Sequence, residues 1–332
     1  MERFIKKITK FFSLTVLLFA IIWINLLIFP NNWSSSSFSI TNNIKNHIES
    51  VKNNEILIIG DSRAVAGFNP KIIDSNKVYN LNLGGATPIT GYFTLKKLLN
   101  SGKTPKLLIV SYAPFHLIED DSYPRIIKED FLNFNEISEL YDEINSENDV
   151  FWRKDEFNYH KYNLVNRYKA YLLKIKFPIF FSAEIKNSKF LRKSENLKMA
   201  YDIKNQMGFF TYGKKDFSDL NNQEVELNTF NINKTISKYL TKLFRLANDN
   251  NIKLIYINTP FNEASKLNLN NSFLNNYEKK FNLYKKEFPE VIFYSQIYSY
   301  ENKYFGDPSH LNKNGSKKFS NYVKGIIEHN KY

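Results

Sequence analysis

The chain has 332 residues, 43% of them hydrophobic, which is enough for one large domain or for one domain with a sizeable insertion. It has no cysteine, which excludes disulfides, thiolate metal sites and a thiol nucleophile. The net charge of +13 suits anionic surfaces such as lipid headgroups or acidic wall polymers, although an abundance of Lys and Asn can also reflect compositional bias alone. We find no nucleic-acid-binding motif and expect no nucleic-acid partner.

The N-terminal segment has the pattern of a membrane anchor. Phe11–Phe29 carries no charge and has about the 20-residue length that spans a bilayer. Basic residues precede it, which predicts a cytoplasmic N-terminus (1–10), a transmembrane helix (11–30) and an extracytoplasmic remainder. A cleaved signal peptide is the alternative, but its apolar region would be shorter and would end in small residues, whereas this one ends at Ile28-Phe29-Pro30.

A linker and then a soluble domain are expected after the anchor. Residues 31–45 are rich in Ser and Asn and are predicted to lead away from the membrane, with Trp33 near the interface. The domain is expected over residues 46–332, with a short helix before its first strand.

The stretch Glu55–Gly67 organises this domain. Ile56–Ile59 is a short apolar run rich in β-branched residues, and Gly60, Asp61 and Ser62 follow it. This pattern predicts a buried parallel strand, a tight turn and a helix. Ser62 would then lie at the carboxyl end of the strand, where α/β proteins bind ligands. It is either a nucleophile or simply the N-cap of the helix.

Strands and helices alternate along the rest of the chain, which predicts a mostly parallel sheet with helices on both faces. The alternation is interrupted at about residues 117–230, where we expect a mostly helical insertion. Its aromatic and basic stretch Tyr159–Phe181 could stack on sugars, lie on a membrane, or form an ordinary amphipathic helix. The other expected strands are Val78–Leu83, Lys106–Ser111, Lys253–Asn258 and Val291–Tyr294, and the main helices are Ile89–Ser101, Glu136–Glu147, Ile232–Asn248, Asn271–Phe288 and Gly315–His329.

A second polar motif lies near the C-terminus. Asp307 and His310 are three residues apart, so one turn can bring both to the same point. A histidine that a carboxylate orients can take a proton from a serine and return it later. On its own, however, this motif also fits the capped start of a helix that carries an exposed histidine.

The two motifs together resemble the SGNH (GDSL-like) hydrolase superfamily. Gly60-Asp61-Ser62 matches its first block, and Asp307 with His310 matches its Asp-x-x-His block. The resemblance implies a three-layer α/β/α (flavodoxin-like) fold with Ser62, His310 and Asp307 as the catalytic residues. It implies an oxyanion hole formed by the N–H groups of Ser62 and Gly85, and it requires neither cofactor nor metal.

The resemblance fails at one block. The family often has an Asn after the third strand that completes the oxyanion hole, but here Pro114 stands near that place and has no N–H to donate. Ser111, Tyr112 or His116 could supply another donor, and nothing in the sequence chooses among them.

The anchor, the Arg63-Ala64 that follows the first block and the His-Leu-Asn of the last block resemble membrane-anchored members of the superfamily. These members include alginate and peptidoglycan O-acetyltransferases and the single-pass protein of D-alanyl transfer to teichoic acids. The implied function is O-acyl transfer to a polysaccharide or wall polymer, beside a multispanning membrane-bound O-acyltransferase. An esterase or deacetylase of a glycan or lipid, and a non-catalytic assembly protein with the same fold, are the alternatives.

Overall fold

The computed structural model describes residues 1–28, 36–53, 55–74, 77–118, 131–147, 193–213 and 215–330. These fall into two compact units, one with residues 1–28, 36–40 and 193–200 and the other with the remainder of residues 41–330. Pro30, Trp33 and the aromatic stretch 159–181, which the sequence analysis singled out, lie outside the described residues.

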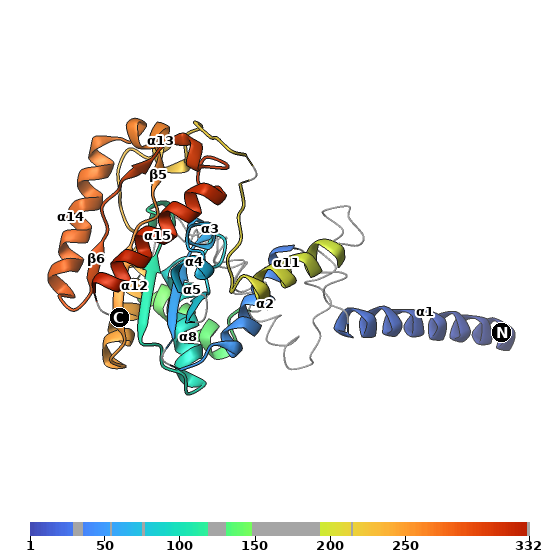
Figure 1. The fold of residues 1–332 in the computed structure, drawn as a ribbon. Coiled ribbons are helices and arrows are strands. Elements are labelled where there is room, and N and C mark those ends of the chain that lie inside the picture. Colours follow the sequence, from blue (N-terminus) through green and yellow to red (C-terminus); the bar gives the residue numbers. More distant parts are fainter. Residues whose placement is uncertain are drawn as a thin grey trace. The chain divides into compact units, whose positions relative to one another are not determined.

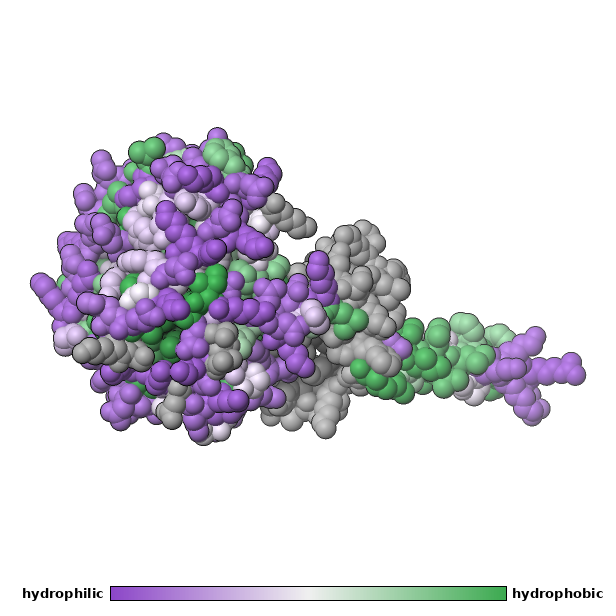
Figure 2. Space-filling model, in the orientation of Figure 1, coloured by the Kyte–Doolittle hydropathy of each residue, from purple (hydrophilic) through white to green (hydrophobic). Residues whose placement is uncertain are grey.

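The first unit begins with the long helix α1 (Glu2–Ile28). It is long and apolar enough to cross a membrane, and its apolar side chains are mostly exposed. Figure 2 shows the green apolar surface of this helix and the purple charged residues at its N-terminal end. The next helix, α2, covers Ser36–Ser50 and therefore begins inside the stretch expected to be a linker.

A five-stranded parallel sheet forms the centre of the second unit (Figure 1). Its strand order is β2-β1-β3-β4-β6. In this doubly wound order, β2 lies on one side of β1 and the later strands lie on the other, so the strand order reverses between β1 and β3. All five strands lie where the sequence predicted them, although the second ends at Asn80 rather than Leu83. The strands are β1 (Ile56–Gly60), β2 (Val78–Asn80), β3 (Leu107–Ser111), β4 (Lys253–Ile257) and β6 (Ile292–Tyr294).

Helices cover both faces of this sheet, as the alternation predicted. On one face, Ile58, Ile109 and Ile255 share a buried cluster with side chains of α3, α4 and α15. On the other face, α5 and α12 pack together and Tyr256 of β4 meets Phe244 of α12 edge to face. The helices are α3 (Ser62–Gly67), α4 (Pro70–Asp74), α5 (Pro88–Asn100), α12 (Lys234–Asp249), α14 (Asn271–Glu287) and α15 (Lys313–His329).

Shorter elements connect this framework. A small parallel pair, β5 (Phe261–Asn262) and β7 (Ser299–Tyr300), lies beside the main sheet. The expected insertion contains no strand in its described part. The remaining elements are α6 (Phe115–Ile118), α8 (Phe134–Glu147), α11 (Lys193–Asn205), η2 (Gln223–Glu226), α13 (Glu263–Asn268) and η3 (Asn302–Tyr304).

Candidate active site

The buried strand β1 delivers Ser62 to the carboxyl edge of the sheet. The chain turns at Asp61 and α3 begins at Ser62. One carboxylate oxygen of Asp61 accepts hydrogen bonds from the N–H groups of Arg63 (2.9 Å) and Ala64 (3.3 Å), so Asp61 is the N-cap. The alternative in which Ser62 caps the helix is therefore wrong, and the Ser62 hydroxyl is left for another contact.

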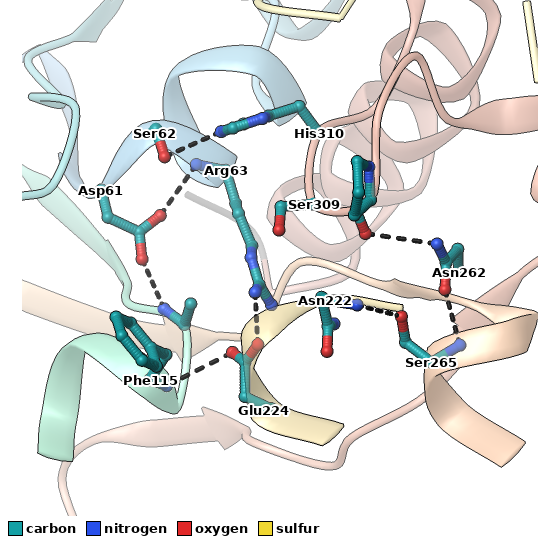
Figure 3. A network of polar contacts seen from close by, with 12 residues as sticks. Asp61, Ser62, Arg63, Phe115, Asn222, Glu224, Asn262, Ser265, Ser309 and His310 are labelled. Atoms are coloured by element: carbon teal, nitrogen blue, oxygen red, sulfur yellow. Dashed lines mark hydrogen bonds and ion pairs between the residues drawn. The ribbon is translucent and has the colours of Figure 1, made fainter. Parts of the chain in front are cut away.

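Asp61 also fixes the neighbouring strand end. Its second oxygen accepts a 2.6 Å hydrogen bond from the N–H of Ala113, just after β3 (Figure 3). Asp61 has no exposed surface, so all three hydrogen bonds are shielded from water. One buried carboxylate thus fixes the turn that carries Ser62 against the loop that follows β3.

The predicted partners of Ser62 are brought to it from the opposite end of the chain. His310 Nε2 lies 2.8 Å from Ser62 Oγ (Figure 3), and His310 Nδ1 lies 2.8 and 2.9 Å from the two oxygens of Asp307. With the carboxylate at Nδ1, the favoured tautomer has its proton there and leaves Nε2 to accept the Ser62 hydroxyl proton.

The turn that carries Asp307 keeps this carboxylate ionised. Burial raises its pKa, but the hydrogen bond and charge of His310, together with the N–H groups of Ser309 and His310 at 2.8 Å, outweigh burial, and the net pKa is lowered. The side chain that orients His310 is therefore an anion at neutral pH, as a Ser-His-Asp unit requires.

Comparison with protein-family models and with curated proteins finds no match to this chain.

The proposed oxyanion hole is less complete than the Ser62–His310–Asp307 contacts. Gly85 follows β2 in a turn with φ of 67°, a left-handed conformation that favours glycine whether or not its N–H meets a substrate. Its role as an oxyanion donor stays a prediction, as does that of the Ser62 N–H. After β3, the N–H of Ala113 is used by Asp61 and Pro114 has none. Tyr112, one of the alternative donors, is only 1% exposed and is buried away from the site's surface.

Sequence reasoning missed an ion pair beside Ser62. The guanidinium of Arg63 donates a 2.6 Å hydrogen bond to Glu224, which lies in η2. The other oxygen of Glu224 accepts from the N–H of Phe115 at 3.3 Å (Figure 3). The Arg63 guanidinium also lies over the ring of Phe261. Arg63 and Glu224 are 161 residues apart, and no local pattern marks Glu224 as a partner.

An aromatic side chain from the insertion covers the histidine. The ring centroids of Tyr212 and His310 are 4.7 Å apart, and Phe210 packs edge-on against Tyr212. The backbone around Gly213 lies directly on Gly306, because a Cβ on either glycine would come within 2.6 Å of the other's backbone. This part of the insertion therefore lies against the turn that carries His310.

Asn262 ties the insertion to the turn that carries Asp307 and His310. Its side-chain amide donates to the carbonyls of Leu220 (2.8 Å) and Pro308 (3.2 Å), while its oxygen accepts from the N–H of Ser265. The Ser265 hydroxyl in turn accepts from the N–H of Asn222 (Figure 3). These bonds hold residues 220–222 beside the turn that carries His310.

Proposed function

We propose that the chain is a membrane-anchored, extracytoplasmic serine O-acyltransferase of the SGNH type that acylates a polysaccharide or wall polymer. The observation that carries this proposal is the chain of contacts from Ser62 Oγ through His310 to Asp307, at 2.8 Å each. A buried strand, a capped helix and a carboxylate-closed turn hold the three groups. This arrangement fits an activated serine better than a structural hydrogen bond, because His310 lies at the surface of the sheet's carboxyl edge.

The proposed reaction has two half-reactions. Ser62 Oγ attacks the carbonyl carbon of an ester or thioester while His310 Nε2 takes the hydroxyl proton. The tetrahedral intermediate collapses, the bond to the leaving group breaks, and His310 returns the proton to that group. A glycan hydroxyl then attacks the acyl-Ser62 carbonyl, His310 takes its proton, and Ser62 leaves and recovers it.

The covering of His310 supports a transferase over a hydrolase. An acyl-serine survives until a sugar arrives only where water is kept from the histidine, and Tyr212 covers one face of that ring. The N–H groups of Ser62 and Gly85 are the proposed oxyanion donors, which leaves a site with backbone donors only. In this proposal a multispanning membrane-bound O-acyltransferase supplies the acyl group.

The tether is part of the same proposal. The helix α1 is proposed to span the membrane with its N-terminus in the cytoplasm, because Arg3, Lys6, Lys7 and Lys10 precede its apolar part. A reporter that is active only outside the cytoplasm should then work when fused after residue 332. A fusion that is active only with a cytoplasmic reporter would contradict this topology.

The activity can be tested with the full chain in detergent. p-Nitrophenyl acetate serves as acyl donor, with and without an oligosaccharide, and mass spectrometry follows the acetyl group. We expect acetylated sugar with the native protein and with Ser272→Ala, a control at an exposed serine on α14, and none with Ser62→Ala. Release of free acetate at the same rate with every sugar would replace the transferase with an esterase. Equal sugar acetylation by Ser62→Ala would remove the covalent mechanism.

A further inference from the structure

A hollow lined by tyrosines lies beside the edge strand β6. It encloses about 480 Å³, a size typical of small-ligand sites. Tyr294, Tyr298 and Tyr300 line it from β6, from the loop that follows β6 and from β7, while Tyr322 approaches from α15. In Figure 2 the surface beside α15 is pale between purple charged residues. We call this hollow the tyrosine groove.

The rings of the tyrosine groove are held in place. Tyr298 meets Tyr300 at 5.8 Å and Tyr322 at 6.4 Å between ring centroids, each in an edge-to-face arrangement. The Lys318 ammonium lies 4.4 Å from the ring centroids of both Tyr300 and Tyr304. Such aromatic and cation–π contacts fix the rings before a ligand arrives, which lowers the entropy cost of binding.

The groove combines apolar ring faces with neutral polar groups. Tyr322 is 45% exposed, and Gln296 and Ser295 add amide and hydroxyl groups to the lining. Burial raises the pKa of Tyr300 to about 12, so its hydroxyl is uncharged and can both donate and accept hydrogen bonds. This chemistry matches a sugar ring, which has apolar C–H faces and a rim of hydroxyls.

Part of the groove's lining, Ser295 and Gln296, follows the carboxyl end of β6, at the edge of the sheet that also carries Ser62. All strands are parallel, so the ends of β1 and β6 point the same way, and only β3 and β4 separate them. Three inter-strand spacings of about 4.8 Å place the two strand ends roughly 14 Å apart. A short oligosaccharide can span this distance.

We propose that the tyrosine groove binds a carbohydrate chain and holds the acceptor of the Ser62 reaction several sugars from the acylated hydroxyl. Other occupants fit less well. Eight residues line the groove, whereas a protein interface uses roughly 20–30 on each side, so a second copy of this chain would need much more surface. Of those eight, Lys285 alone is charged, which is unlike the basic track that a nucleic acid needs.

The role in acylation rests on the proposed function, but binding can be measured without it. The Ser62→Ala full chain in detergent is titrated calorimetrically with cellohexaose, chitohexaose and hexagalacturonate. We expect saturable binding of at least one of these, weakened tenfold or more by Tyr322→Ala and by Tyr300→Ala. Tyr322→Phe, which keeps the ring, should bind within threefold of the parent, as should Tyr201→Ala, a tyrosine on α11 that is 69% exposed.

Two results would overturn the proposal. One is the absence of saturable binding to all three sugars, and the other is binding that Tyr300→Ala and Tyr322→Ala leave unchanged. Sedimentation of the same variants tests the competing occupant, because a dimer that both substitutions dissolve would assign the groove to a second copy. Sugar binding in a protein that fails to label at Ser62 would keep the groove and remove the acyltransferase.

Discussion

Removing the charge of Glu224 is expected to destabilise the domain strongly and to disturb the position of Ser62. Glu224 is fully buried and is the ion-pair partner of Arg63, whose own side chain is 6% exposed. Glu224→Gln keeps the shape of the side chain and leaves an oxygen for the N–H of Phe115. It leaves the Arg63 guanidinium buried without a counter-charge.

The expected magnitude follows from that burial. Removing one partner of a buried ion pair costs about 3–5 kcal/mol, because the remaining charge stays desolvated. At about 2–4 °C per kcal/mol for a domain of this size, the melting temperature should fall by roughly 6–20 °C. Arg63→Met combined with Glu224→Gln removes both charges, so the double variant should be more stable than Glu224→Gln alone.

Thermal unfolding of the full chain in detergent measures this cycle. The matched control is Arg245→Met, which breaks the exposed pair with Glu287 at 3.2 Å and should cost about 1 kcal/mol or less. If the melting temperature of Glu224→Gln is no lower than that of Arg245→Met, the pair does not act as a buried, coupled unit. The same conclusion follows if the double variant is destabilised by the sum of the effects of Arg63→Met and Glu224→Gln.

Three further results are expected. The pKa of Asp307 is lowered in the folded chain. The stabilisation from its carboxylate is therefore present above the unfolded pKa of about 3.9 and is lost as the pH falls through the lower folded pKa. The difference in melting temperature between the native protein and Asp307→Asn should be widest above about pH 5 and should close in stronger acid. Gly213→Ala places a Cβ within 2.5 Å of the Gly306 backbone and should reduce both acyl transfer and stability. Gly325→Ala in α15, where a Cβ meets nothing within 4 Å, is the control and should stabilise the protein by about 0.5–1 kcal/mol. Equal melting temperatures of the two variants would contradict the close packing at Gly213. Tyr212→Ala removes an aromatic contact with His310 of about 0.5–1.5 kcal/mol and should lower kcat about two- to tenfold. Tyr212→Phe keeps the ring and should keep the native kcat. An equal loss of kcat in both variants would mean that the hydroxyl matters rather than the ring.

Local patterns predicted the framework and both ends of the candidate site. The strands were predictable because a parallel strand that is buried on both faces must be apolar, as Ile56–Ile59 is. The Asp307–His310 turn was predictable because its hydrogen bonds close within three residues. Ser62 and His310 were paired only through the family resemblance, since no rule of spacing joins residues 248 positions apart.

Features built from distant segments were not predictable. The partner of Arg63 lies in the insertion, where Glu224 is one acidic residue among many until the fold buries it. The contact of Tyr212 with His310 depends on how residues 206–213 pass the turn that carries His310, and no periodicity in the sequence encodes that path. The tyrosines between residues 294 and 304 were visible in the sequence, but a common groove required α15 beside them.

The most direct test of the central claim is labelling by a fluorophosphonate, which reacts with activated serines and retains a covalent adduct. The full chain is labelled in detergent, and intact-mass measurement and peptide mapping locate the adduct. We expect one adduct on Ser62, none on Ser62→Ala, and labelling slowed about 10²–10⁴-fold in His310→Ala, the range over which a general base acts. Adducts on another serine, or equal labelling of native protein and His310→Ala, would contradict a nucleophile that His310 and Asp307 activate.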